Sequence, residues 1–138
     1  ALFGEAVVLV NPELQKEFRY SIKQHGGMLA KGRLLGIQFD RLFTDDLFFK
    51  AAAHANQMAM KLKKGLAECG VEFMADSVTN QQFPVFTKEI IDALEQEFLF
   101  EHNGKMGDNK YAIRFCTSWA TKEENVEHLI NTVKAMLQ

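Results

Sequence analysis

The sequence is poor in the residues that mark several large classes of protein. Its 138 residues include two cysteines, two prolines and one tryptophan. Cys69 and Cys116 have neither a Cys-x-x-Cys partner nor metal-ligand spacing, so they make no disulfide framework and no structural zinc site. We therefore expect both to be reduced, buried thiols of a cytoplasmic protein. No basic segment of the kind that opens a secretory signal peptide precedes the first apolar run.

An excess of charge and long apolar runs are also absent. Sixteen basic and eighteen acidic residues give a net charge of −2, and the two signs are well mixed along the chain. This composition favours neither a nucleic-acid partner nor a basic membrane patch. The apolar runs fall short of the ~20 residues that a membrane span needs. What is present, 47% hydrophobic residues in 138, is enough for one domain with a core.

The first 25 residues begin as if inside a larger structure. The chain starts at Ala1 and reaches AVVLV, residues 6–10, almost at once. Such a run predicts a short buried strand, and a buried strand needs neighbours on both sides. We therefore expect a piece of a longer chain. Asn11 and Pro12 then predict the start of a helix that ends at His25-Gly26-Gly27.

Helical spacing dominates the next segment, from residue 28 to residue 68. Two helices are predicted, over 28–43 and 45–68, the second with an apolar stripe of the kind that packs in a core. Gly32 and Gly36 lie four residues apart in the first of them. They cost helix stability, and a close approach of another backbone or a ligand would compensate for it.

From residue 71 the pattern changes to strands with one short helix between them. Strands are predicted over 71–76, 79–86, 98–102 and 110–119, a helix from Thr87, and a last helix from a capping box of Thr121 and Glu124. Turn residues at Asn103-Gly104 and Gly107-Asp108-Asn109 indicate an antiparallel return. The fold class is therefore α+β, with a small antiparallel β-β-α-β-β-α sheet covered by helices and preceded by one strand and two to three helices.

Arg114 is the main candidate for a functional residue. It stands in the segment KYAIRFCTSW, where Tyr111, Ile113 and Phe115 form one large apolar face. The opposite face carries the small residues Ala112 and Cys116 beside the arginine. One interpretation is an arginine paired with a nearby acid or reaching out from a sheet edge. The other is a carboxylate clamp, because guanidinium matches a carboxylate with two parallel hydrogen bonds.

Other chemistry-bearing residues show no shared pattern. No nucleophilic triad, metal motif or phosphate-binding glycine loop is present. The acidic pairs at 45–46 and 123–124 fit helix starts, where they offset the helix dipole. We expect the four histidines to be surface residues or to have their hydrogen bonds satisfied; they are His25, His54, His102 and His128.

Four segments, in order, resemble one enzyme family. KYAIRFCTSWATKEENVEHLINTV resembles the closing segment of the L-threonine aldolase and aromatic amino acid β-eliminating lyase family. The other three segments are FGEAVVLVNPEL, HGGMLAKGRLLGIQF and SVTNQQFPVF, which resemble the strand and helix after the cofactor lysine, the start of the small domain, and its Thr-Asn strand. Together they span essentially the whole chain.

The resemblance implies a pyridoxal 5′-phosphate enzyme of the aspartate aminotransferase fold, fold type I. The family's Schiff-base lysine lies just before a segment like ALFGEA, so none of the residues here is expected to be that lysine. The implied organisation is a remnant of the large domain over residues 1–25 and the C-terminal small domain over 26–138. Implied partners are a small amino-acid substrate and further copies of the longer chain, as a homodimer or homotetramer.

Site residues carry over from the family one by one. Arg114 resembles the arginine that holds the substrate α-carboxylate. Lys31 resembles the basic residue near the glycine-methionine turn that reaches the cofactor phosphate, in many members from a partner subunit. Aldolases commonly have an arginine directly after that methionine, where this sequence has Leu29, so Arg33 is a second candidate for the phosphate role.

These implications predict the C-terminal part of a lyase that cleaves a β-hydroxy or aromatic amino acid. The separate chain should be inactive, because the cofactor lysine lies elsewhere. One alternative is a non-enzymatic regulatory module in which Arg114 grips an amino-acid effector. Another, compatible with the first, is an association module whose helical half packs against a partner.

Overall fold

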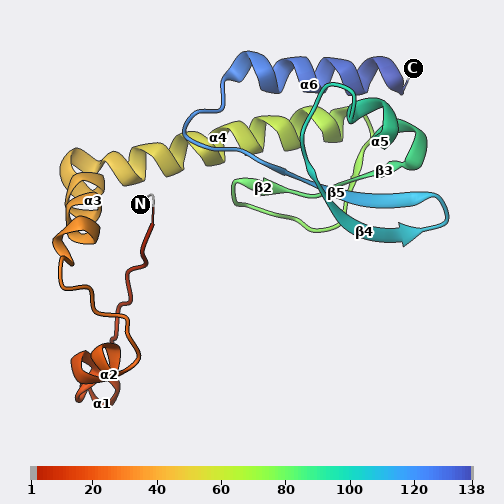
Figure 1. The fold of residues 1–138 in the computed structure, drawn as a ribbon. Helices are drawn as coiled ribbons and strands as arrows, with labels where there is room; N and C mark the ends of the chain where they lie inside the picture. Colours follow the sequence, from red (N-terminus) through yellow and green to blue (C-terminus); the bar gives the residue numbers. More distant parts are fainter. Residues whose placement is uncertain (1–2, 138) are drawn as a thin grey trace. The chain divides into compact units, whose positions relative to one another are not determined.

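The computed structural model describes residues 3–137, which divide into two compact units, the first ending at Phe48 and the second beginning at Phe49 (Figure 1). The predicted boundary between residues 25 and 26 refers to the domains of a longer chain, and it stays a prediction. No helix of the described residues is long and apolar enough to cross a membrane.

Short helices make up the first unit. Asn11 caps the first of them as predicted, its side chain accepting a hydrogen bond of 3.0 Å from the Glu13 backbone N–H. The single helix predicted over 13–24 is wrong, because Glu17 adopts a left-handed conformation, φ 53°, that interrupts it. The helices of this unit are α1 (Pro12–Gln15), α2 (Phe18–Gln24), α3 (Arg33–Phe43) and the 3-10 turn η1 (Thr44–Asp46).

The buried strand predicted over residues 6–10 is also wrong for this chain. The segment pairs with no strand of the described residues. The side chains of Val7, Val8 and Val10 are 63%, 83% and 85% exposed. Because a strand needs neighbours for its backbone hydrogen bonds, an apolar run without them stays an irregular extended segment. No described residue of the first unit is buried.

Helix α4 (Leu47–Glu68) confirms the predicted long helix. The predicted stripe residues Ala55, Met58, Leu62 and Leu66 are buried, together with Ala59. The predicted stripe begins at Leu47, which is 45% exposed and lies outside the core. The helix begins two residues later than predicted. Asp45 and Asp46 both have positive φ angles, 53° and 58°, which a regular helix does not allow.

The second unit contains a small antiparallel sheet. Its strand order is β1-β3-β5-β2, and β4 pairs with the other edge of β5. The predicted α+β fold class is confirmed, although the strand predicted over 79–86 divides at Phe83. The elements after α4 are β1 (Glu72–Phe73), β2 (Gln81–Gln82), β3 (Pro84–Thr87), α5 (Lys88–Leu94), β4 (Glu101–Gly107), β5 (Lys110–Cys116) and α6 (Glu123–Met136).

Two local predictions in this unit are wrong. The fourth strand begins at Glu101 and runs through Asn103-Gly104, which forms an irregularity in the ladder instead of a turn. The β4–β5 hairpin turns at Asp108-Asn109. The capping box also fails, because the Thr121 hydroxyl accepts a hydrogen bond of 2.8 Å from the Ser118 backbone N–H, outside the helix.

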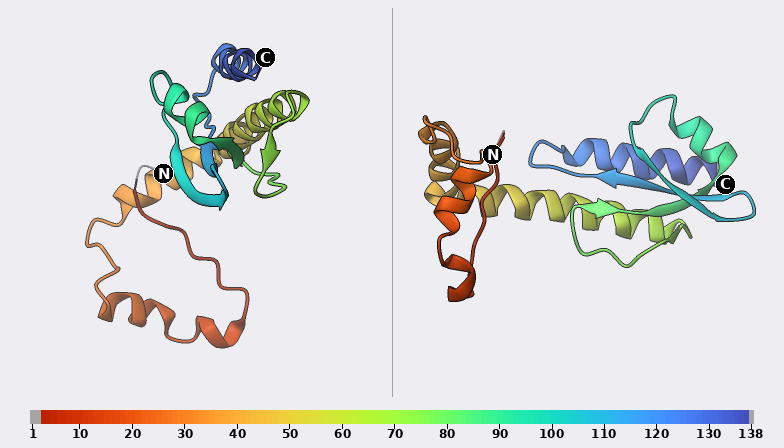
Figure 2. Two further views of the ribbon diagram at one scale, coloured as in Figure 1. Left: turned by 90° about the vertical axis from the view of Figure 1, so that its right-hand side faces the viewer. Right: turned by 60° about the horizontal axis from the view of Figure 1, so that its bottom comes forward.

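The core of this unit lies on one face of the sheet, the face that α4, α5 and α6 cover (Figure 2). Gly65 of α4 permits a close approach of α6, since a Cβ there would lie 2.4 Å from Ile130 Cδ1. The sheet's other face is here called the outer face. Cys116 lies on the outer face and is exposed, and Cys69 is half-buried, so the prediction of two buried thiols is wrong.

Candidate functional site

Arg114 stands near the middle of the outer face, on the strand that pairs with three others. The neighbouring residues Ile113 and Phe115 belong to the core, so the alternation of a strand turns Arg114 away from the helices. The register identifies further residues of the outer face, because directly paired residues share a face. They are Glu101 opposite Arg114, Val85 opposite Ala112, Gln81 opposite Cys116, and Glu72 opposite Val85.

The guanidinium of Arg114 lacks the acidic partner that one sequence interpretation required. Its side chain is half-buried, and its Nε atom is buried without a hydrogen-bond partner. Within residues 3–137, no carboxylate forms an ion pair with it. A buried donor without an acceptor costs free energy, so the arrangement suits a site that an external acceptor completes.

Two other charged residues of the outer face, Lys110 and Glu72, are paired with each other. Lys110 Nζ lies 2.8 Å from a Glu72 carboxylate oxygen. This hydrogen bond, with the charge of the lysine, lowers the pKa of Glu72 below its ordinary value. Lys110 is thus a cation engaged by a neighbour, whereas Arg114 on the same strand is not.

Lys31 and Arg33 lie in the first unit, at the start of α3. Both are exposed, and neither forms an ion pair within the described part of the chain. Gly32 occupies the N-cap position, so no side chain caps the first N–H groups of the helix. A shallow cavity of about 490 Å³ adjoins them. The structure therefore brings Lys31 and Arg33 together, while Arg114 belongs to the other unit.

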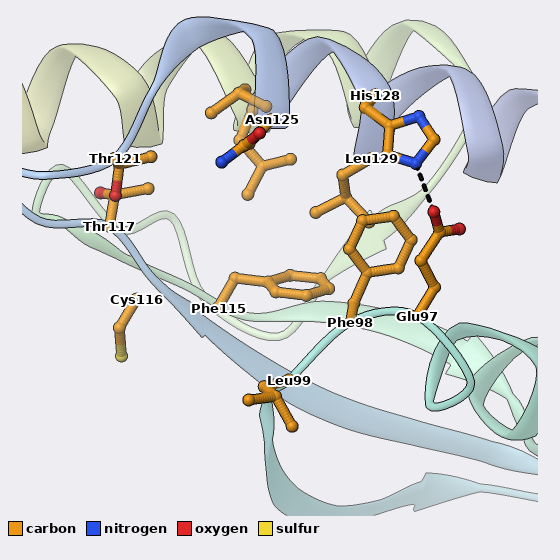
Figure 3. Close-up of a pocket in the computed structure, with 12 residues that line it drawn as sticks. Glu97, Phe98, Leu99, Phe115, Cys116, Thr117, Thr121, Asn125, His128 and Leu129 are labelled. Carbon is orange, nitrogen blue, oxygen red and sulfur yellow. Dashed lines mark hydrogen bonds and ion pairs between the residues drawn. The ribbon is translucent and has the colours of Figure 1, made fainter.

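Sequence reasoning missed a groove in the second unit, shown in Figure 3. Its volume is about 510 Å³, and it opens where β5 ends beside α6 and the segment before β4. His128 Nε2 lies 2.6 Å from a Glu97 oxygen along its wall. No spacing in the sequence links these segments. The lining residues are Leu62, Glu97, Phe98, Leu99, Phe115, Cys116, Thr117, Thr121, Asn125, Val126, His128 and Leu129.

All four histidines have hydrogen-bond partners, as predicted. His25 Nδ1 lies 2.8 Å from the Ser21 carbonyl, and His54 Nε2 lies 2.8 Å from the Thr121 carbonyl. His102 and His128 lie beside glutamates. No group of three or more metal-ligating side chains occurs among residues 3–137.

Known proteins similar to this chain are threonine aldolases. No family model matches the sequence. A low specificity L-threonine aldolase from a Pseudomonas strain is 30% identical over 97% of this chain. One from Pseudomonas aeruginosa is 29% identical over 97%. A solved structure of Leishmania major threonine aldolase is 40% identical, with a TM-score of 0.82 over 87% of this chain and 35% of its own.

The chain spans 38% of the length of the curated relatives it matches. The identity to the Leishmania major enzyme is high enough for the shared fold to reflect common descent. The resemblance to the threonine aldolase family is thus confirmed, and the chain is homologous, over nearly its whole length, to a part of such an enzyme.

Proposed function

We propose that the chain is the C-terminal part of a pyridoxal-phosphate-dependent lyase that cleaves a β-hydroxy or aromatic amino acid, and that Arg114 holds the substrate α-carboxylate. The observation that carries this proposal is the buried Arg114 Nε without a partner on the outer face of the sheet. The homology to threonine aldolases supports the reaction class.

Arg114 has the chemistry that such a clamp needs. Its guanidinium stays protonated at physiological pH and offers a planar fork to a carboxylate. Partial burial strengthens charge-assisted hydrogen bonds, because less water competes for the donors. Its strand pairs on both edges, so the arginine backbone stands on a rigid platform. Fixing the carboxylate orients the Cα substituents, and orientation lowers the barrier to bond breaking.

Lys31 and Arg33 fit the phosphate group of the cofactor in this proposal. Two exposed cations flank a helix start whose N–H groups have no side-chain cap. Backbone N–H groups at a helix N-terminus and nearby cations both attract phosphate. The cofactor, when bound, would supply the electron sink for cleavage of the Cα–Cβ bond. These residues would bind and position it, in their own subunit or in a partner subunit.

The first unit supports a place within a longer protein. It exposes many apolar side chains and buries none, as expected for a segment that other parts of a protein cover. On this proposal the cofactor lysine lies in the preceding domain, the separate chain is inactive, and the longer protein is a cytoplasmic homodimer or homotetramer.

The clamp can be tested in the longer protein by comparing two cation deletions on β5. Arg114→Ala should lower kcat/KM for threonine at least about 100-fold, because it removes both binding and orientation. Lys110→Ala is the matched control, since it removes a cation of the same face that already pairs with Glu72. It should change kcat/KM less than about threefold. Equal effects of the two variants would refute the role of Arg114.

A further inference from the structure

We propose that Glu101 is a specificity-determining residue, which makes Arg114 selective for ligands with a single carboxylate. Glu101 faces Arg114 across the β4–β5 ladder. The inference rests on the proposed role of Arg114 and adds the substrate class, namely amino acids whose side chain carries no negative charge.

The register places the two side chains side by side. Directly opposite residues of an antiparallel pair have Cβ atoms about 4.5–5.5 Å apart and share a face. Leu99 precedes Glu101 by two residues and is 99% exposed, whereas Phe100 packs against Phe115 in the core. The alternation therefore turns Glu101 to the outer face with Arg114.

The two opposite charges nevertheless do not form an ion pair. No oxygen of Glu101 lies within 4.0 Å of an Arg114 nitrogen, and within the described residues Glu101 pairs with no other cation. The buried Nε–H of Arg114 likewise donates no hydrogen bond to Glu101. Glu101 is thus an uncompensated negative charge beside the guanidinium, whereas Glu72 on the same face is neutralised by Lys110.

An uncompensated carboxylate beside an anion site discriminates by charge. Repulsion between two unit charges about 6 Å apart in water weakens binding about threefold, and the repulsion free energy doubles for a dianion. A single carboxylate on Arg114 gains more from the guanidinium than it loses to Glu101. A second carboxylate on the same molecule is also repelled by Glu101, and Arg114 has no second guanidinium with which to bind it. The repulsion by Glu101 thus gives specificity at a small loss of affinity.

The test measures anion binding at Arg114 in the 138-residue chain by NMR of the arginine Nε–H groups. Acetate and malonate are titrated at pH 7 and constant ionic strength, against sodium chloride as the reference. The variant is Glu101→Gln, and the matched control is Glu72→Gln, which removes the same charge from the same face but away from Arg114. An Arg114→Lys chain assigns the resonance.

We expect Glu101→Gln to raise the affinity for malonate relative to acetate about threefold or more, and Glu72→Gln to leave the ratio within about 1.5-fold. An unchanged ratio in Glu101→Gln, with both anions still perturbing Arg114, would overturn the role of Glu101 and leave the clamp standing. If neither anion perturbs Arg114 in any variant, the clamp itself is wrong and the inference falls with it. Equal changes in both variants would show an effect of net charge only, which also overturns the inference.

Discussion

The two units differ in what holds them together. The second buries a cluster of apolar side chains between the sheet and three helices, including Leu66, Leu94 and Val133. The first, of similar hydrophobic character, buries no described residue. Its apolar side chains point to solvent, as with Val8 and Val10 at 83% and 85% exposure. Apolar content alone therefore does not make a core; the elements must also have partners to pack against.

The contrast also separates the candidate site residues. Arg114 rests on a strand that the core holds in place, so its position is defined within this chain. Lys31 and Arg33 rest on a segment with no core of its own. A site on a rigid platform is preorganised, whereas Lys31 and Arg33 have no core beneath them to hold their positions. The predictions below test this difference, beginning with the largest effect.

Amide hydrogen exchange should divide the chain at the start of α4. Helix and strand amides of the second unit should be protected up to the free energy of global unfolding, and those of residues 4–32 hardly at all, because nothing buries them. The expected difference is several orders of magnitude in exchange rate. Mass spectrometry of peptic fragments measures it. Equal protection in both regions would show that the first unit has a stable core of its own.

Truncation of one buried and one exposed isoleucine sharpens the same contrast. Ile113→Ala removes a side chain of the core that is fully buried, and it should cost about 2–5 kcal/mol of unfolding free energy. Ile37→Ala is the control in the first unit, where the side chain is 57% exposed. It should cost less than about 0.5 kcal/mol. Urea unfolding curves followed by circular dichroism give both values. A large loss for Ile37→Ala would contradict the account of the first unit.

Two glycines in helices should respond differently to a larger side chain. Gly65→Leu forces atoms into the space of Ile130 between α4 and α6, with an expected cost of about 1–3 kcal/mol. A Cβ at Gly36 would meet nothing within 4 Å, and Gly36 belongs to the first unit, so Gly36→Leu should leave the melting of the second unit unchanged. Thermal melts of the two variants and the wild type measure both changes in melting temperature. If Gly65→Leu melted like the wild type, the helices would not approach as closely as described.

The smallest expected effect concerns acid sensitivity. Lys61 bonds to Glu123 and Glu127 of α6, and the bond lowers the pKa of Glu123. A depressed carboxyl pKa stabilises the fold above the unfolded value near 4.5, and that contribution is lost as the pH falls through the folded pKa. Lys61→Met should therefore flatten the decrease in melting temperature between pH 6 and pH 3.

Lys64→Met is the control for this acid-sensitivity test. Its residue lies on the same helix but only approaches Glu68, at 3.9 Å. The slope of melting temperature against pH should remain that of the wild type. An identical slope in the Lys61 and Lys64 variants would contradict the part assigned to the α4–α6 ion pairs.

Sequence reasoning succeeded where one local signal agreed with the packing. The stripe of α4 and the alternation around Arg114 are such cases, because a single buried face fixes both. It failed where the structure depends on neighbours. The run at residues 6–10 predicts a buried strand, yet it pairs with no strand among residues 3–137. Sequence reasoning also failed at Asn103-Gly104, because residues typical of turns also occur at irregular positions within a strand.

The candidate site shows the same division. The place of Arg114 on the face away from the core followed from strand alternation alone. Whether Arg114 has an acidic partner could not be predicted in the same way. The acidic residue opposite it, Glu101, is identified only by the register of the β4–β5 ladder. The groove beside α6 was missed for the same reason: Phe98, Phe115 and Leu129 meet only in the folded unit.

The proposal assigns the substrate carboxylate to this chain and the cofactor lysine to another part of the protein. Reductive trapping with pyridoxal phosphate and borohydride tests this assignment most directly, with mass spectrometry locating the modified lysine. In the longer protein, one lysine outside the 138 residues should be modified stoichiometrically, and the separate chain should show only weak labelling spread over its lysines. Stoichiometric modification of a single lysine within this chain would contradict the assignment.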